Sequence, residues 1–344
     1  MKKKARITCE VKRLYLKHTW TIARGSSQYR DNVFVTINKD DICGYGEAAP
    51  IPRYGQTSDT AVAAIGHLTA PVERSDLFEY RTLIANLQAI EPQQTAARLA
   101  IEMAVMDWLS KSYRVPYYRL LGLNPNRVPA TSFSIGIDSP EVIRSKVAEA
   151  EAFPFLKVKL GLDNDREIVE AVRSTTGKPL RVDANEGWQD KEEAVKKIAW
   201  LQGHGVELVE QPLPSHMLEE TAWLRERCGI PLIADESVMD AADIPKLAGA
   251  FDGINIKLMK CGGLQAALEM ITVARAHGMK VMLGCMIESC LAISAAASIA
   301  PLVDYVDLDG NLLLRDDPFV GVAVKGGQLE LSDACGIGAR PIKL

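Results

Sequence analysis

From about residue 130 to residue 310 the chain repeats one unit, a short apolar strand followed by a loop and an amphipathic helix. Strands that alternate with helices of this length form βαβ units and a parallel sheet. Eight strands with seven helical segments between them are expected here, and eight parallel strands close into a barrel. The predicted strands are Thr131–Ile137, Phe155–Leu160, Leu180–Ala184, Val206–Glu210, Pro231–Asp235, Gly253–Lys257, Lys280–Gly284 and Tyr305–Asp309.

An open doubly wound sheet is the alternative architecture. Such a sheet usually carries a glycine-rich phosphate loop after its first strand, and no such loop follows the first predicted strand. The pattern therefore favours the barrel.

The flanking regions do not share the repeat. Val33–Asn38 and Ile42–Glu47 alternate in polarity around a short turn, which predicts an antiparallel hairpin, and Thr95–Ser110 is expected to be a helix. We predict an α+β capping domain at residues 1–125, the barrel at 126–310, and a C-terminal segment at 311–344 that returns to the capping domain.

Composition excludes several classes of partner. The 344-residue chain has a net charge of −4 and no basic field for nucleic acid, and no apolar stretch approaches the roughly 20 residues of a membrane span. No apolar run follows the basic N-terminal residues, and the seven cysteines are scattered, as in a reduced protein. We expect a cytoplasmic protein; the sequence is compatible with a homo-oligomer but specifies no oligomeric state.

Three lysines lie on predicted barrel strands. Lys157 and Lys159 share one face of the second strand, and Lys257 ends the sixth, which lies across the axis of an eight-stranded barrel. A solvated lysine pair on an edge strand is the alternative, but the apolar neighbours of Lys157 and Lys159 favour a buried strand, where unpaired ammonium groups are costly. Lys260, three residues after Lys257, is assigned to a loop.

Three carboxylates end the strands between these lysines: Asp183, Glu210 and Asp235. One acidic residue after a strand is usually a helix N-cap or a surface group. Three on successive strands would repel one another and raise their pKa values unless a cation lies between them. Oxygen ligands without histidine or cysteine favour Mg²⁺, and then Mn²⁺, over zinc.

Five segments together resemble a known family: Lys157-Val-Lys159, Arg181-Val-Asp-Ala-Asn-Glu-Gly-Trp188, Val209-Glu-Gln-Pro212, Ala234-Asp-Glu-Ser237 and Asn255-Ile-Lys-Leu258. They are similar to the signatures of the enolase superfamily, muconate-lactonizing subgroup, and within it of the dipeptide epimerases. The resemblance covers nearly the whole chain. It implies an α/β protein with a modified (β/α)7β TIM-type barrel and an α+β capping domain. It also implies an isomerase that inverts a dipeptide, with L-Ala-D-Glu or L-Ala-L-Glu from murein peptides as the expected substrate.

The same resemblance implies roles for the barrel residues. The reaction would be a two-base 1,1-proton transfer through a metal-stabilised enediolate. The two bases would need lowered pKa values, to which burial, Lys157 and the metal would contribute. The implied roles are metal ligation by Asp183, Glu210 and Asp235, acid/base catalysis by Lys159 and Lys257, ligand orientation by Asn185 and Glu236, and binding of the substrate carboxylate by Lys157.

Substrate recognition is assigned to the last strand and to the capping loops. Asp307 and Asp309 share a face opposite the metal and are placed to bind the N-terminal ammonium of a dipeptide; the alternative is that they cap the following turn. The resemblance implies that Arg24 binds the substrate glutamate side chain. The remaining residues assigned to substrate binding are Ser134, Arg53 and Tyr54.

Other functions stay open at this stage. Cycloisomerisation, o-succinylbenzoate synthesis and N-acylamino-acid racemisation use similar lysines and metal but do not need Asp307 and Asp309. Epimerisation of a different dipeptide needs the same machinery. A Schiff-base aldolase could use one barrel lysine, and a non-catalytic binding protein would not require two opposed lysines.

Overall fold

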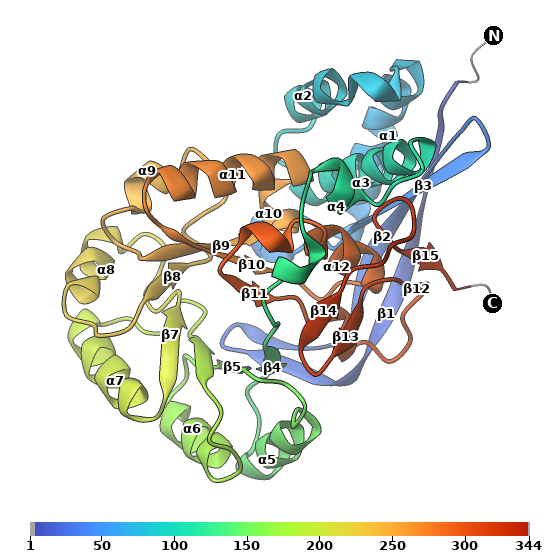
Figure 1. Cartoon of the computed structure of the whole chain (residues 1–344). Helices are drawn as coiled ribbons and strands as arrows, with labels where there is room; N and C mark the ends of the chain where they lie inside the picture. Colours follow the sequence, from blue (N-terminus) through green and yellow to red (C-terminus); the bar gives the residue numbers. More distant parts are fainter. Residues whose placement is uncertain (1–3, 343–344) are drawn as a thin grey trace.

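A computed structural model of the protein describes residues 4–342; residues 1–3, part of the basic N-terminal stretch, and 343–344 lie outside it. Eight parallel strands form one sheet in which sequence neighbours are also spatial neighbours (Figure 1). The sheet closes on itself, because Thr131 bridges in parallel to Val306 and the Ser132 N–H donates to the Val306 carbonyl at 3.3 Å. The predicted barrel is confirmed. Its strands are β4 (Phe133–Ile135), β5 (Leu156–Lys159), β6 (Leu180–Asp183), β7 (Val206–Glu210), β8 (Leu232–Ala234), β9 (Gly253–Lys257), β10 (Lys280–Gly284) and β11 (Tyr305–Asp307).

Every connection between consecutive barrel strands contains a helix, as the sequence predicts. In α6, Ile168, Val169 and Val172 are buried on the face toward the sheet. The helix α7 begins at an N-cap, Asp190, whose side chain accepts hydrogen bonds from two backbone N–H groups of the first turn. The helices are α5 (Pro140–Glu149), α6 (Asp165–Arg173), α7 (Lys191–Gly203), α8 (Leu218–Arg225), α9 (Ile244–Leu247), α10 (Leu258–Cys261), α11 (Leu264–Ala276) and α12 (Cys290–Ala297).

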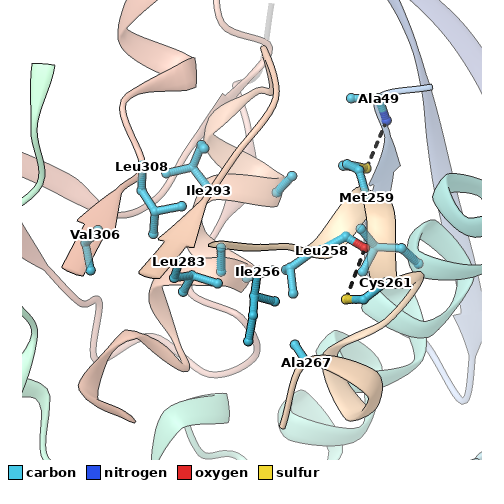
Figure 2. Close-up of a cluster of buried hydrophobic side chains, with 14 of the residues drawn as sticks. Ala49, Ile256, Leu258, Met259, Cys261, Ala267, Leu283, Ile293, Val306 and Leu308 are labelled. Atoms are coloured by element: carbon cyan, nitrogen blue, oxygen red, sulfur yellow. Dashed lines mark hydrogen bonds between the residues drawn. The ribbon is translucent and has the colours of Figure 1, made fainter. Parts of the chain in front are cut away.

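Apolar packing outside the barrel determines which side chains face its axis. Figure 2 shows Ile256 of β9 and Leu283 of β10 in a buried apolar cluster that also contains Ala267 of α11. Because side chains alternate along a strand, the residues that flank Ile256, Asn255 and Lys257, point to the opposite face. Burial of Ile256 therefore directs these two polar side chains into the barrel.

The N-terminal region forms an antiparallel sheet of β1 (Arg6–Ile22), β2 (Gly25–Lys39) and β3 (Ile42–Ala48). The predicted hairpin is confirmed, with β2 and β3 joined through Asp40 and Asp41, which both have positive φ. The strand β1 is an addition to the prediction. The helices of this region are α1 (Ser58–Arg74), α2 (Tyr80–Ile90), α3 (Thr95–Ser112), which confirms the predicted helix, and α4 (Tyr117–Leu120).

Two glycines let β3 lie directly against α3. A Cβ on Gly44 would lie 2.0 Å from the carbonyl oxygen of Ala104, and a Cβ on Gly46 would lie 1.9 Å from that of Ala100. No side chain fits at either position, so the glycines permit this close backbone approach.

Two buried carboxylates join the N-terminal region to the barrel. Glu47 of β3 accepts hydrogen bonds from the Ser289 N–H at 2.9 Å and the Ser289 hydroxyl at 2.5 Å, at the start of α12. Glu102 of α3 accepts from the Gln265 N–H at 2.8 Å, at the start of α11. Each carboxylate thus satisfies backbone N–H groups that a helix N-terminus leaves without a partner.

The C-terminal segment contacts the N-terminal region. The Ile337 N–H donates to Asp107 of α3 at 3.0 Å, and the ring of Phe319 stacks on Phe34 of β2 with centroids 5.5 Å apart. Its strands are β12 (Phe319–Val320), β13 (Ala323–Lys325), β14 (Gln328–Glu330) and β15 (Arg340–Pro341). The domain boundaries themselves stay a prediction. Within residues 4–342, no helix combines the length and apolar character that crossing a membrane requires.

Candidate active site

Three carboxylates meet at the C-terminal ends of neighbouring barrel strands. Asp183 ends β6, Glu210 ends β7, and Asp235 directly follows β8. Each offers one oxygen, and these three oxygens lie within 4.8 Å of one another. Burial, together with the charge of Asp183, raises the pKa of Glu210 to about 8. Hard anionic oxygens at this spacing fit a metal site of the kind that Mg²⁺ occupies.

Two lysines reach the triad from opposite sides. In the order of strands around the sheet, β5 and β9 are separated by β6, β7 and β8. The Lys159 ammonium of β5 lies 2.5 Å from Asp183 Oδ2, and the Lys257 ammonium of β9 lies 2.7 Å from Asp235 Oδ2. Both side chains also line the large cavity at the mouth of the barrel, so a molecule in that cavity would contact both.

A third lysine lies deeper. The Lys157 ammonium is 2.7 Å from Glu210 Oε2 and 2.6 Å from Asp307 Oδ2, and the residue is 1% exposed. Burial would lower the pKa of Lys157, but Asp307, Glu210 and Asp183 outweigh it and raise that pKa. In the same way, Asp235 and Glu210 outweigh burial and raise the pKa of Lys257. The lowered pKa that a base requires is therefore not supplied by the protein groups around Lys257.

Asp307, the last residue of β11, and Asp309, two residues beyond that strand, hold different partners. Asp307 accepts from the Lys157 ammonium and from the Ser132 hydroxyl at 2.9 Å. Asp309 accepts from the Ser134 N–H at 2.6 Å, and burial and the charge of Asp307 raise its pKa to about 7. The alternative that Asp309 caps the following turn is wrong, since its side chain makes no cap hydrogen bond to that turn. Asp309 and Ser134 instead line the cavity.

Loops of the capping region close one side of a cavity of about 960 Å³. Arg24, between β1 and β2, lies 2.8 Å from Glu236 Oε1 and donates to the Asn185 carbonyl at 3.0 Å. Arg53 forms an ion pair with Glu186, and Tyr54 lines the cavity beside it. The Asn185 amide also donates to Glu236 at 3.3 Å. The structure thus brings all the predicted site residues to one place; their roles stay predictions.

Comparison with known protein families agrees with this geometry. Residues 5–122 match the family described as "Mandelate racemase / muconate lactonizing enzyme, N-terminal domain", and residues 142–342 match "Enolase C-terminal domain-like". The chain belongs to the enolase superfamily.

Individual relatives of this superfamily are similar over nearly the whole chain. The L-Ala-D/L-Glu epimerase of Bacteroides thetaiotaomicron is 43% identical over 96% of this chain and 86% of its own length. The L-Ala-D/L-amino acid epimerase of Pedosphaera parvula is 41% identical over 93% of this chain and 94% of its own length. A dipeptide epimerase of Cytophaga hutchinsonii, solved with Mg and D-Ala-L-Val, has a TM-score of 0.94 at 27% identity, covering 100% of this chain and 97% of that one.

Three polar residues at this enolase-superfamily site were not identified from the sequence. The assignment of Lys260 to a loop is wrong: it lies in α10, is 2% exposed, and its ammonium lies 2.6 Å from Asp235 Oδ1. Asn255 donates to Glu210 Oε1 at 2.8 Å. Glu186 forms ion pairs with both cap-loop arginines, Arg24 and Arg53. For Asn255 and Lys260, the sequence offered one indication: both lie within three residues of Lys257, at the junction between β9 and α10.

Proposed function

We propose that the protein is a Mg²⁺-dependent dipeptide epimerase that inverts the C-terminal residue of L-Ala-D-Glu or L-Ala-L-Glu. One observation carries the proposal: Lys159 and Lys257 reach the same buried acidic triad from opposite sides of the barrel. Inversion of a carbon centre requires a proton to leave one face and another to arrive on the opposite face, which two opposed amines can provide. The relatives named as epimerases support the same reaction class.

The lysines and the acidic triad would have separate roles in the reaction. Lys159 would hold or move the proton on one face of the α-carbon, and Lys257 would do so on the other. Lys157, fully buried and charged, would stabilise the substrate carboxylate. A metal ion bound by Asp183, Glu210 and Asp235 would offset the negative charge that develops on that carboxylate and would oppose the effect of the triad on the pKa of Lys257.

The ends of the substrate would be bound at separate places. Asp309, beside Ser134 at the cavity wall, would bind the N-terminal ammonium, because Asp307 is already paired with Lys157. The cap-loop arginines, Arg24 and Arg53, would bind a glutamate side chain. Such substrates derive from murein peptides, and we propose a cytoplasmic role in their metabolism.

The test follows isotope exchange in D₂O with Mg²⁺ present. The wild-type protein should incorporate deuterium at the glutamate α-position of both diastereomers of the dipeptide. Lys159→Ala should retain exchange from one diastereomer only, and Lys257→Ala from the other, while Lys246→Ala on the exposed surface of α9 should behave as wild type. Absence of exchange with every Ala-Glu isomer would reject this substrate, and equal exchange of both isomers by both lysine variants would reject the two-base assignment.

A second candidate is epimerisation of dipeptides with other C-terminal residues. The observation that favours it is that Arg24 is already ion-paired with Glu236, so its charge is partly neutralised. The relative named as acting on L-Ala-D/L-amino acids agrees with this wider range. If Arg24 binds the glutamate side chain, Arg24→Met should lower the activity toward Ala-Glu more than the activity toward a hydrophobic dipeptide. An equal loss of activity toward Ala-Glu and toward a hydrophobic dipeptide would favour the wider specificity.

A further inference from the structure

Each carboxylate of the triad has one oxygen held by a donor that is not one of the three central lysines. Asp183 Oδ1 accepts from the backbone N–H of Asn185 at 2.9 Å. Glu210 Oε1 accepts from the Asn255 side-chain amide at 2.8 Å. Asp235 Oδ1 accepts from the Lys260 ammonium at 2.6 Å. All three carboxylates are therefore fixed in rotation by the surrounding protein.

The second oxygen of each carboxylate contacts one of the three central lysines. Asp183 Oδ2 contacts Lys159 at 2.5 Å, Glu210 Oε2 lies 2.7 Å from Lys157, and Asp235 Oδ2 contacts Lys257 at 2.7 Å. The triad thus divides into three fixed outer oxygens and three inner oxygens. We take the inner oxygens as the ones that a metal ion held by the triad would contact.

The Lys260 donor is rigid. Its ammonium also reaches the carbonyl oxygens of Asp235 at 2.5 Å, Val238 at 3.1 Å and Asn255 at 3.3 Å. The ammonium is thus surrounded by oxygen acceptors within hydrogen-bond distance, and the residue is only 2% exposed. A lysine in this position cannot easily leave Asp235, so that carboxylate keeps one oxygen occupied.

The Asn255 donor is also held in place, by packing on β10. A Cβ added to Gly284 would lie 2.6 Å from Asn255 Oδ1, so the absence of a side chain at Gly284 makes the space that the amide fills. Asn255 itself is 0% exposed. The strand pairing of β9 with β10 therefore aims the amide at Glu210.

We propose that Lys260 and Asn255 are positioning residues that hold Asp235 and Glu210 to one metal-facing oxygen each and thereby favour Mg²⁺ over Ca²⁺. Mg²⁺ needs a compact octahedral shell, whereas Ca²⁺ accepts six to eight oxygens and readily binds a carboxylate through both of its oxygens. Removal of either donor lets the carboxylate rotate and offer its second oxygen, which benefits Ca²⁺ more. The inference rests on the metal site of the proposed function.

The ratio of the two dissociation constants is the informative quantity. Loss of the Lys260 charge changes the attraction for both divalent ions alike, so this electrostatic effect largely cancels in Kd(Ca²⁺)/Kd(Mg²⁺). A general loss of stability also leaves the ratio for the folded protein unchanged. Only a change in how the carboxylates are presented alters the two ions differently.

The experiment titrates MgCl₂ and CaCl₂ by calorimetry into the metal-free full-length protein. Lys260→Met and Asn255→Leu remove one donor each at similar volume, Lys246→Met is the surface control, and circular dichroism checks that each variant is folded. We expect the ratio Kd(Ca²⁺)/Kd(Mg²⁺) to fall by about tenfold in each donor variant and to stay constant in the control. Because the two donors act on different carboxylates, one folded variant is enough for the test. Gly284→Ala, whose Cβ would displace the Asn255 amide, is a third variant.

An unchanged ratio in a folded donor variant, including the case of an equal loss of affinity for both ions, would overturn the inference. A wild-type protein that binds no Mg²⁺ would reject the metal site and this inference together. A protein that shows the expected change in ratio but no α-proton exchange would contradict the proposed epimerase alone.

Discussion

Glu102 gives the sharpest prediction on stability, because its carboxylate is buried between α3 and the start of α11 at 1% exposure. Burial raises the pKa of Glu102 to about 7 from 4.5, although the N–H groups of Gln265 and Leu264 and the charge of Arg98 oppose the change. The loss of hydration therefore outweighs the favourable position at a helix N-terminus, which contributes at most about 2 kcal/mol.

The sign of the pH effect follows from linkage. At a pH below 4.5 the carboxyl is protonated in both the folded and the unfolded state, and its burial has no ionic cost. Between pH 4.5 and about 7 the unfolded state ionises first, so the free energy of unfolding falls as the pH rises. The difference between the two pKa values corresponds to about 3 kcal/mol.

Glu102→Gln should remove this dependence, because the amide oxygen still accepts from the Gln265 N–H and carries no charge. Measured by urea unfolding, the stability of the variant relative to wild type should increase by about 3 kcal/mol between pH 4.5 and about pH 8. Glu269→Gln, on the exposed face of α11, the helix whose start Glu102 contacts, is the matched control and should show a constant difference. A constant difference for Glu102→Gln as well would refute the burial argument.

Three further predictions concern the backbone, the substrate and the metal. Gly46→Ala should destabilise the fold by about 1–3 kcal/mol, because its Cβ would lie 1.9 Å from the Ala100 carbonyl oxygen, whereas Gly66→Ala has open space; equal thermal midpoints would contradict this. Asp309→Asn should raise KM by about tenfold for a dipeptide with a free N-terminal ammonium and leave its N-acetylated form unaffected, and a parallel change for both would exclude the proposed contact. Mg²⁺ at about 100 times its Kd should raise the free energy of unfolding by about 2.7 kcal/mol and EDTA should reverse this, so an unchanged unfolding curve would exclude a native-state site.

The barrel and the centre of the site could be predicted from the sequence because both depend on the order of apolar and polar residues within single strands and helices. A strand that ends in Asp183 or Glu210 places its carboxylate at the C-terminal rim whatever the rest of the chain does. Lys157 and Lys159 on an apolar strand could be assigned to the interior because an unpaired buried ammonium is too costly to occur by chance. Because side chains alternate along a strand, two lysines that are two residues apart must point to the same side, the axis of the barrel.

The remaining features depend on contacts between distant segments. In β1, Ile7, Cys9 and Val11 alternate with polar residues as in a strand, but only Ile7 of the three is buried, so the apolar face that the pattern implies is mostly exposed. Nothing in the sequence around Lys260 indicates burial, yet α10, which directly follows β9, places its ammonium 2.6 Å from Asp235 Oδ1. Arg24 contacts the Asn185 carbonyl 161 residues away, and a sequence pattern contains no information on that pairing.

The carboxylates of Glu47 and Glu102 have a consequence for how molecules reach the barrel mouth. A rigid rotation of the capping region would break the hydrogen bonds of both carboxylates and leave the N–H groups at the starts of α11 and α12 without these partners. The loops that carry Arg24 and Arg53 line the cavity and contact the barrel through ion pairs with Glu186 and Glu236, so we expect access to the cavity to depend on these two loops. Substitutions in these two loops would then alter the entrance, while Glu47 and Glu102 continue to join the capping region to the barrel that carries the lysines and the triad.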